Sequence, residues 1–198
     1  MTAIIYILAF VGGFSIMSLE LLGGRVLAPY FGSSIYVWGS IITVFMLSLS
    51  IGYLLGGRLS MNRPSLVRFA MIFAAAALCL YPLVLTSEDI MTWVFERVED
   101  PRYGSLLASG LLFIVPTVIM GMISPYSVRL LVRTTEHSGL IAGILYFVST
   151  LGSALGTLAT SFYLVLWFEM NEILMLLTGS LAGAALVALA AARWQARQ

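Results

Sequence analysis

The chain has 198 residues, of which 61% are hydrophobic and 10% are charged, and its formal net charge is +1. Soluble domains carry about 25% charged residues, so this composition excludes a soluble globular protein. No basic face is large enough for nucleic acid. The single cysteine, Cys79, permits neither a disulfide nor a cysteine-based metal site, and we expect no metal and no cofactor.

Six apolar runs, each long enough to cross a bilayer at roughly 20 residues, follow one another along the chain. The first is far longer than the apolar core of a signal peptide and has no basic segment before it, so we expect it to be retained. The connections are short, which predicts one all-α integral membrane domain over residues 1–198, surrounded by the lipid bilayer. The predicted helices cover residues 4–28, 36–57, 65–86, 104–128, 139–166 and 172–192.

The charged residues predict the orientation of the chain in the membrane. All ten basic residues are arginines, and most lie in the second and fourth connections and at the C-terminus, whereas the third and fifth connections are acidic. Under the positive-inside rule, the arginine-bearing connections and both termini face the cytoplasm. We expect a bacterial inner-membrane protein with Arg63 inside and residues 87–103 outside.

The third connection, TSEDIMTWVFERVEDPRYGS, has apolar residues at helical spacing. Thr86 or Ser87 can cap a helix and Pro101 can end it, which predicts a short amphipathic helix over residues 87–100 on the outer surface. Basic interfacial helices bind anionic lipid, but this one is acidic. We interpret it as a cover for the end of the bundle or as a lid or docking surface.

The two halves of the chain share short motifs. Ala28-Pro29-Tyr30 ends the first predicted helix and Ser124-Pro125-Tyr126 ends the fourth, and helices two and five each carry two glycines four residues apart. Because each half has three helices, the halves cross the membrane in opposite senses. This pattern is typical of the 3+3 inverted repeat in each six-helix half of a major facilitator, although close helix packing also explains such glycines and Pro125. The glycine pairs are Gly52 with Gly56 and Gly152 with Gly156.

Three long stretches resemble the membrane region of the fused MFS/spermidine synthase family. They are MSLELLGGRVLAPYFGSSIYVWGSIITVFMLSLSIGYLLGGRL, PTVIMGMISPYSVRLLVR and GILYFVSTLGSALGTLATSFYLV. The resemblance covers essentially the whole chain and implies a six-helix, half-MFS-like bundle. In that family the membrane region is joined to a spermidine-synthase-like domain, which would begin where this sequence stops, at Gln198.

We expect that the chain by itself is not an enzyme. Aminopropyl transfer needs a cavity for a nucleoside cofactor and carboxylates for the amine, but the only aspartates, Asp89 and Asp100, lie in the third connection. No glycine-rich turn follows a strand. The sole histidine, His137, is predicted in a cytoplasmic loop, so no nucleophile and histidine can meet inside the bundle.

Glu20 and Arg25 are ionisable residues in the outer part of the first predicted helix. A rise of 1.5 Å per residue places Glu20 roughly 24 Å along this helix, inside a hydrocarbon core about 30 Å thick. A charge at the centre of a membrane helix costs about 2.5–3.5 kcal/mol, so it usually faces the bundle and finds a partner. One interpretation is a structural Glu20–Arg25 ion pair. The other is a site for a cationic or amine ligand at Glu20, with Tyr30, Tyr36 and Trp38 able to contact the cation.

The stretch GYLLGGRLSMNRP resembles the loop between helices two and three of major facilitators, where glycines and basic residues govern gating. Gly52, Gly56, Gly57 and Arg58 match that motif, whereas Ser60 stands near the place of its usual acidic residue. The arginines of this stretch are also explained by topology alone.

Three functions from different classes remain open. The first, which the sequence favours, is a membrane scaffold or anchor that docks a protein partner, such as a spermidine-synthase-like protein. The second is a half-size transporter of an amine or another small solute that acts as a homodimer. The third is a purely structural subunit of a larger complex.

Overall fold

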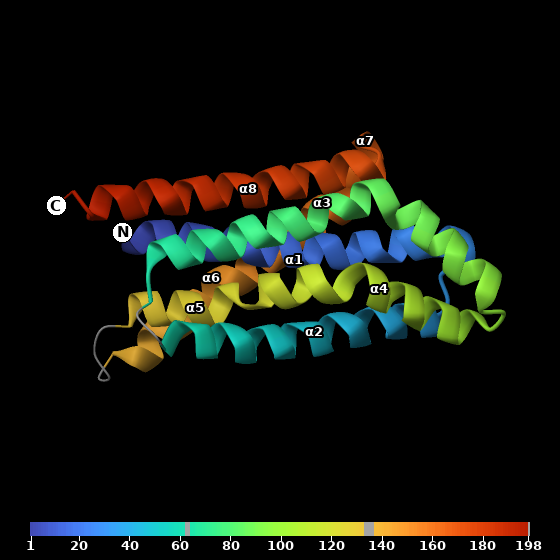
Figure 1. Cartoon of the computed structure of the whole chain (residues 1–198), viewed down its shortest axis with the longest axis horizontal. Helices are drawn as coiled ribbons and strands as arrows, with labels where there is room; N and C mark the ends of the chain where they lie inside the picture. Colours follow the sequence, from blue (N-terminus) through green and yellow to red (C-terminus); the bar gives the residue numbers. More distant parts are fainter. Residues whose placement is uncertain (62–63, 133–136, 198) are drawn as a thin grey trace.

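The computed structural model describes residues 1–61, 64–132 and 137–197 of the chain, so Arg63 lies outside the described residues. The described residues form an elongated bundle of long helices with both termini at the same end (Figure 1). Among the described residues, six helical stretches are long and apolar enough to cross a membrane, as predicted. The helices are α1 (Thr2–Phe31), α2 (Ile35–Met61), α3 (Leu66–Arg97), α4 (Pro101–Gly121), α5 (Ile123–Leu131), α6 (Ser138–Ala159), the π-helical turn η1 (Thr160–Leu164), α7 (Val165–Trp167) and α8 (Met170–Gln195).

The separate amphipathic helix predicted over residues 87–100 does not form. α3 continues through this segment to Arg97, because residues 87–97 contain no glycine or proline. Thr86 and Ser87 therefore lie inside α3, and Pro101 begins α4 instead of ending a helix. The last turns of α3 bend across the end of the bundle (Figure 1).

Pro82 lies inside α3 and favours a bend in this helix. Its ring removes one hydrogen bond of the helix, and the hydroxyl of Thr86 donates to the Pro82 carbonyl at 2.9 Å. Such a bond from a side chain to the carbonyl four residues earlier commonly bends a helix.

Close backbone contacts join two pairs of helices. α1 packs mainly against α6, α2 against α4 and α3 against α8. In the first two pairs, two glycines of one helix lie against backbone carbonyls four residues apart in the other, where a Cβ would collide. Gly152 and Gly156 of α6 meet the carbonyls of Phe10 and Phe14 in α1, and Gly52 and Gly56 of α2 meet those of Val118 and Met122 beside α4.

Two features of the sequence lie at different places from those predicted. The segment from Gly52 to Arg58 belongs to α2, which continues to Met61, and is not a loop. Ala28-Pro29-Tyr30 lies in the last turn of α1, whereas Ser124-Pro125-Tyr126 lies in the first turn of α5. The fourth predicted helix is divided at Met122, because Pro125 has no N–H to donate to the carbonyl four residues earlier.

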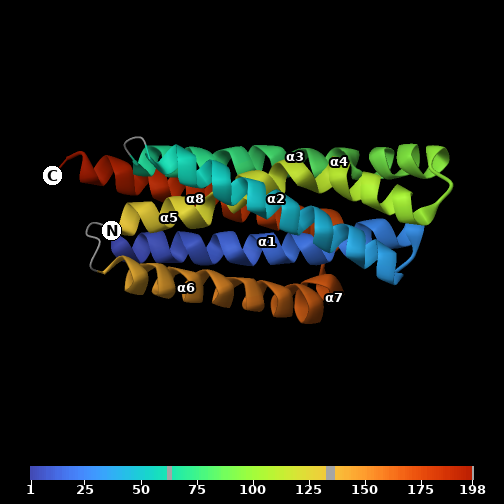
Figure 2. The ribbon, with the colours of Figure 1, turned by 90° about the horizontal axis from the view of Figure 1, so that it is seen from below.

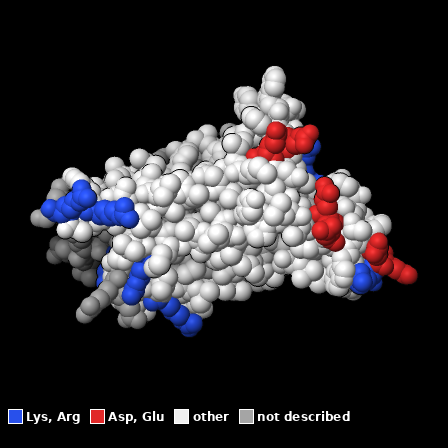
Figure 3. Space-filling model, turned by 45° about the horizontal axis from the view of Figure 1, so that its top comes forward, with Lys and Arg blue, Asp and Glu red and all other residues white. Residues whose placement is uncertain are grey.

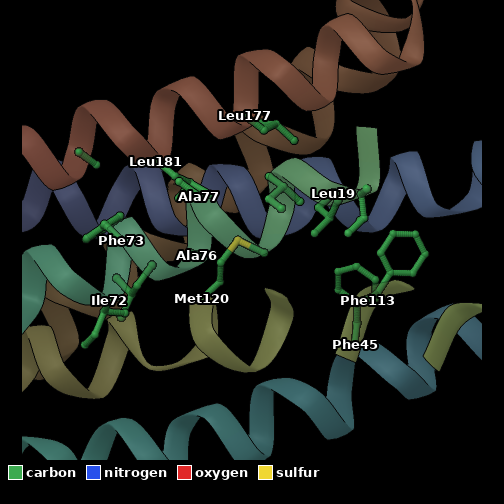
Figure 4. Packing of buried hydrophobic residues seen from close by; sticks show 14 of the residues in the cluster. Leu19, Phe45, Ile72, Phe73, Ala76, Ala77, Phe113, Met120, Leu177 and Leu181 are labelled. Carbon is green, nitrogen blue, oxygen red and sulfur yellow. The ribbon is translucent and has the colours of Figure 1, made fainter. Parts of the chain in front are cut away.

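Apolar side chains fill the centre of the bundle. Met120 of α4 extends toward Ala76 of α3, and the rings of Phe45 and Phe113 join α2 to α4 with their centroids 5.5 Å apart (Figure 4). α6 contributes little to this core and lies on the outside of the bundle beside α1 (Figure 2). Only 17% of its apolar stretch is buried, against 39% to 50% for the other five spans.

On the face that Figure 3 shows, the charged residues gather at the two ends of the bundle. Figure 3 shows arginines at the end that carries the termini and carboxylates at the opposite end, together with a few arginines. We call these the arginine end and the acidic end. That the arginine end faces the cytoplasm stays a prediction.

Candidate functional site

Glu20 and Arg25 do not form the predicted ion pair. Successive residues turn about 100° around an α-helix, so positions five apart are separated by about 140° and their side chains leave α1 in different directions. The Nη1 atom of Arg25 donates instead to the Val165 carbonyl of α7, at 3.2 Å. The interpretation of Glu20 and Arg25 as a structural ion pair is therefore wrong.

The Glu20 carboxylate is half-buried within the α1 span. No hydrogen bond or ion pair joins it to another residue in the described ranges. Gly23 and Gly24, just beyond it, admit rings from neighbouring helices: a Cβ at Gly24 would lie 2.7 Å from the Trp38 ring, and one at Gly23 would lie 3.2 Å from the Phe113 ring. The Glu20 carboxylate can thus accept hydrogen bonds from a group outside the described bundle.

The three aromatic residues predicted around Glu20 have different surroundings. The Trp38 ring lies against Gly24, one turn beyond Glu20 on the same side of α1. The Tyr30 hydroxyl is 3.2 Å from the hydroxyl of Thr92, and its ring meets Phe95 edge-on. Tyr36 is 43% exposed near the start of α2. Of the three, only Trp38 is shown to lie on the side of α1 that carries Glu20.

A pocket of about 460 Å³ opens between α1, α2, α6 and the α4–α5 break. This volume falls in the range of roughly 300–1,000 Å³ that is usual for small-molecule sites. We call it the hydroxyl pocket because its walls carry an unusual number of hydroxyl side chains for an apolar bundle. They belong to Tyr53, Ser124, Tyr146, Ser149, Thr150 and Ser153.

The break between α4 and α5 forms one wall of the hydroxyl pocket. Gly121, Ser124 and Pro125 all line it. In a continuous helix the carbonyl of Gly121 would accept from the N–H four residues later, but Pro125 has none. The wall therefore contains a backbone acceptor without its regular helical donor, beside the hydroxyl of Ser124.

α1 and α6 form another wall. A Cβ at Gly13 would collide with the carbonyl of Ser149, so only glycine allows the two backbones to approach this closely. The hydroxyl of Ser153 lies within 3.2 Å of the carbonyls of both Gly13 and Ser149, to which it can donate. These backbone contacts fix α6 against α1 at this wall.

Glu20 lies on the same side of α1 as the hydroxyl pocket. Gly13, Ile16 and Met17 line the pocket, and Glu20 follows them by seven, four and three residues, which places it on the same helical face one turn further on. The side chains of Tyr53 and Tyr146 at the pocket are 48% and 55% exposed. The pocket and Glu20 thus share the outward-facing side of the bundle between α2 and α6.

A π-helical turn, which the sequence did not predict, joins α6 to α7 near this side. The buried hydroxyl of Thr160 in η1 donates to Ser18 of α1 at 2.9 Å, and Ser18 donates to the Gly156 carbonyl at 3.4 Å. π-helical turns are frequent at functional sites. Here the turn fixes α6 against α1 beyond the glycine contacts.

No family model, curated protein or solved structure matches this chain. Among the residues that the structure describes, no group of three or more histidines, cysteines or carboxylates could hold a metal ion.

Proposed function

We propose that this chain is a six-helix membrane subunit that pairs with a second copy of itself through the side between α2 and α6. The pair encloses the hydroxyl pocket and Glu20 as a binding site for a small cationic amine. The observation that carries this proposal is the half-buried Glu20 carboxylate, which has no partner in the described bundle and lies on the face of α1 that lines the pocket.

The cost of burying a charge argues for a partner of Glu20. A carboxylate in the hydrocarbon region costs about 2.5–3.5 kcal/mol even on insertion scales, and such residues usually face a protein interior or a water-filled cavity. Arg25 donates to the Val165 carbonyl and forms no ion pair with Glu20. A protonated amine supplies the missing positive charge, and a second copy of the chain shields the carboxylate from lipid.

The pocket has the chemistry that an ammonium group needs. An ammonium group offers only hydrogen-bond donors, whereas hydroxyls and backbone carbonyls accept them. Tyr53, Tyr146 and Ser124 supply hydroxyl oxygens, and the carbonyl of Gly121 lacks its regular helical donor. The tyrosine rings also attract a cation through their faces.

The packing of the two halves supports the pairing. The glycine pair of α6, in the second half, meets carbonyls of α1 in the first half. The glycine pair of α2, in the first half, meets carbonyls of the α4 segment in the second half, so the two contacts are equivalent. This reciprocity is what a 3+3 inverted repeat produces, and two such six-helix halves build a major facilitator. The resemblance to the fused MFS/spermidine synthases implies the same arrangement.

A second candidate function is a scaffold that docks a helix of a different protein. It is favoured by an apolar groove of about 440 Å³ between α3 and α8. Ala77, Ala182 and Ala185 line this groove, and small residues let another helix approach closely in a membrane. Co-purification in mild detergent separates the two: a different protein bound at this groove supports the scaffold, and a self-pair supports the binding subunit.

The proposal is tested with a diamine and its neutral analogue. Putrescine is titrated against the purified protein by calorimetry beside 1,4-butanediol, which has hydroxyls in place of the ammonium groups. We expect putrescine alone to bind, and Glu20→Gln to weaken it by about tenfold or more, as for the loss of one charge-assisted hydrogen bond. The control is Glu96→Gln, an exposed carboxylate in the bent part of α3. Equal binding of the two ligands, or of wild type and Glu20→Gln, would contradict the proposal.

A further inference from the structure

A second, smaller pocket lies at the acidic end of the bundle and has no part in the function proposed above. It has a volume of about 190 Å³ and is formed by the end of α1, the bent part of α3 and the start of α8. Its apolar floor includes Val26 and Met91, which are 5% and 0% exposed. We call it the end pocket.

The end pocket carries one positive and one negative side chain that do not pair. Arg25 of α1 and Glu88 of α3 both line it and both are exposed, yet no ion pair joins these two described residues. Arg25 uses one N–H on the Val165 carbonyl, and a guanidinium has five. The Glu88 carboxylate has no hydrogen-bond partner in the described part of the chain. The two charges are therefore available to one ligand.

A serine lines the end pocket together with these two charges. Ser87 lines the end pocket and is only 4% exposed, and its hydroxyl bonds to no residue within the described ranges. A serine inside a helix can bond to the carbonyl four residues earlier, as the neighbouring Thr86 does with Pro82. The Ser87 hydroxyl is therefore available to donate to a polar ligand in the end pocket.

We propose that the end pocket binds a small zwitterion. The ammonium group of the ligand lies on Glu88, and its anionic oxygens accept from Arg25 and from the hydroxyl of Ser87. A ligand with one sign of charge satisfies only one of the two side chains and is repelled by the other. The pocket is smaller than the roughly 300–1,000 Å³ of sites for drug-sized ligands, which suits a compact group.

Two sources provide this chemistry. One is the phosphoethanolamine headgroup of a membrane lipid, which is available at the end of a membrane-spanning bundle. The other is a free amino acid. Both present an ammonium and an anionic group a few bonds apart, so the pocket residues engage them alike and the source is decided by measurement.

The proposal is tested with soluble probes on the purified full chain. Glycerophosphoethanolamine, glycine, inorganic phosphate and ethanolamine are titrated by calorimetry. We expect a zwitterion to bind about tenfold or more tightly than either single-charge probe, since it gains one more charge-assisted contact. Tighter binding of glycerophosphoethanolamine identifies the lipid headgroup as the source, and tighter binding of glycine identifies the amino acid.

Three variants test the contacts. We expect Glu88→Gln and Arg25→Gln each to lower the affinity for the zwitterion by about tenfold or more, and Ser87→Ala to lower it several-fold. The controls are Asp89→Asn and Arg97→Gln, at exposed residues of the same helix end, and their affinities should stay within about twofold of wild type. Because Arg25 also bonds to Val165, Glu88→Gln is the decisive variant. The proposal would be overturned if the zwitterion bound no more tightly than phosphate or ethanolamine, or if Glu88→Gln left its affinity unchanged.

Discussion

Gly156 lies so close to Phe14 that a Cβ on the glycine would stand 2.5 Å from the Phe14 carbonyl oxygen. Gly156→Ala must push α6 away from α1, and overpacking of this kind costs about 1–3 kcal/mol. We expect a lower unfolding temperature in detergent. Gly183→Ala in α8 is the matched control, because no atom lies within 4 Å of its added Cβ. It should leave stability unchanged or raise it, since alanine is favoured over glycine in helices by roughly 0.5–1 kcal/mol. Equal losses in the two variants would refute the close contact.

The side chains of Glu20 and Arg25 should act independently on stability. Without an ion pair, the changes in stability caused by Glu20→Gln and Arg25→Gln add up in the double variant, with a coupling below about 0.5 kcal/mol. We expect Arg25→Gln to be the more destabilising, because it removes the bond to the Val165 carbonyl. The measurement is thermal unfolding of the four proteins. A coupling above about 1 kcal/mol would indicate that Glu20 and Arg25 interact, which would contradict the structure.

The hydroxyl of Thr160 should hold the π-helical turn to α1. Thr160→Val keeps the shape of the side chain but removes the donor to Ser18. Hydrogen bonds between membrane helices contribute about 0.6 kcal/mol on average, so a small but measurable drop in unfolding temperature is expected. Thr178→Val is the control, because that hydroxyl donates within its own helix to Leu174. A larger loss at Thr178 would show that the bond to Ser18 is not important.

Asp100 should make the start of α4 sensitive to acid. Its carboxylate accepts hydrogen bonds from the side chain and backbone N–H of Arg102, which lower the pKa of Asp100 below its ordinary value. A carboxyl group with a lowered pKa in the folded state stabilises the fold above the unfolded pKa of about 3.9, and the stabilisation disappears as the pH falls through the folded pKa. We expect unfolding temperatures to fall below about pH 4 less steeply in Asp100→Asn than in wild type. Identical pH profiles would contradict this role.

Much of the fold could be predicted from the sequence, because the length of each apolar run indicates whether it forms a membrane-spanning helix. Runs of about 20 apolar residues predicted six membrane helices, and the described part of the chain contains six helical stretches of that length and composition. Helix ends were harder to predict. Serine, glutamate and aspartate after Thr86 signal a helix start, but they are also tolerated inside a helix, and α3 continues through them.

The candidate site was predicted only in part. Glu20 was identified because a carboxylate in an apolar run is conspicuous, but its pairing with Arg25 was wrong because a spacing of five residues does not bring side chains together. The hydroxyl pocket was missed, since Tyr53, Ser124 and Tyr146 come from segments far apart in the chain. Their neighbourhood depends on packing that no local pattern reports. Pro125 was the one local signal, because it requires a break in the helix that forms the pocket wall.

Cross-linking in native membranes tests whether the side between α2 and α6 closes against a second copy. In a Cys79→Ser background, a single cysteine replaces Phe147 of α6, which is 66% exposed, or Leu186 of α8, which is 68% exposed, and a short bis-maleimide is added. We expect a covalent dimer from position 147 and little from position 186. A dimer from position 186 alone, or from neither position, would contradict it.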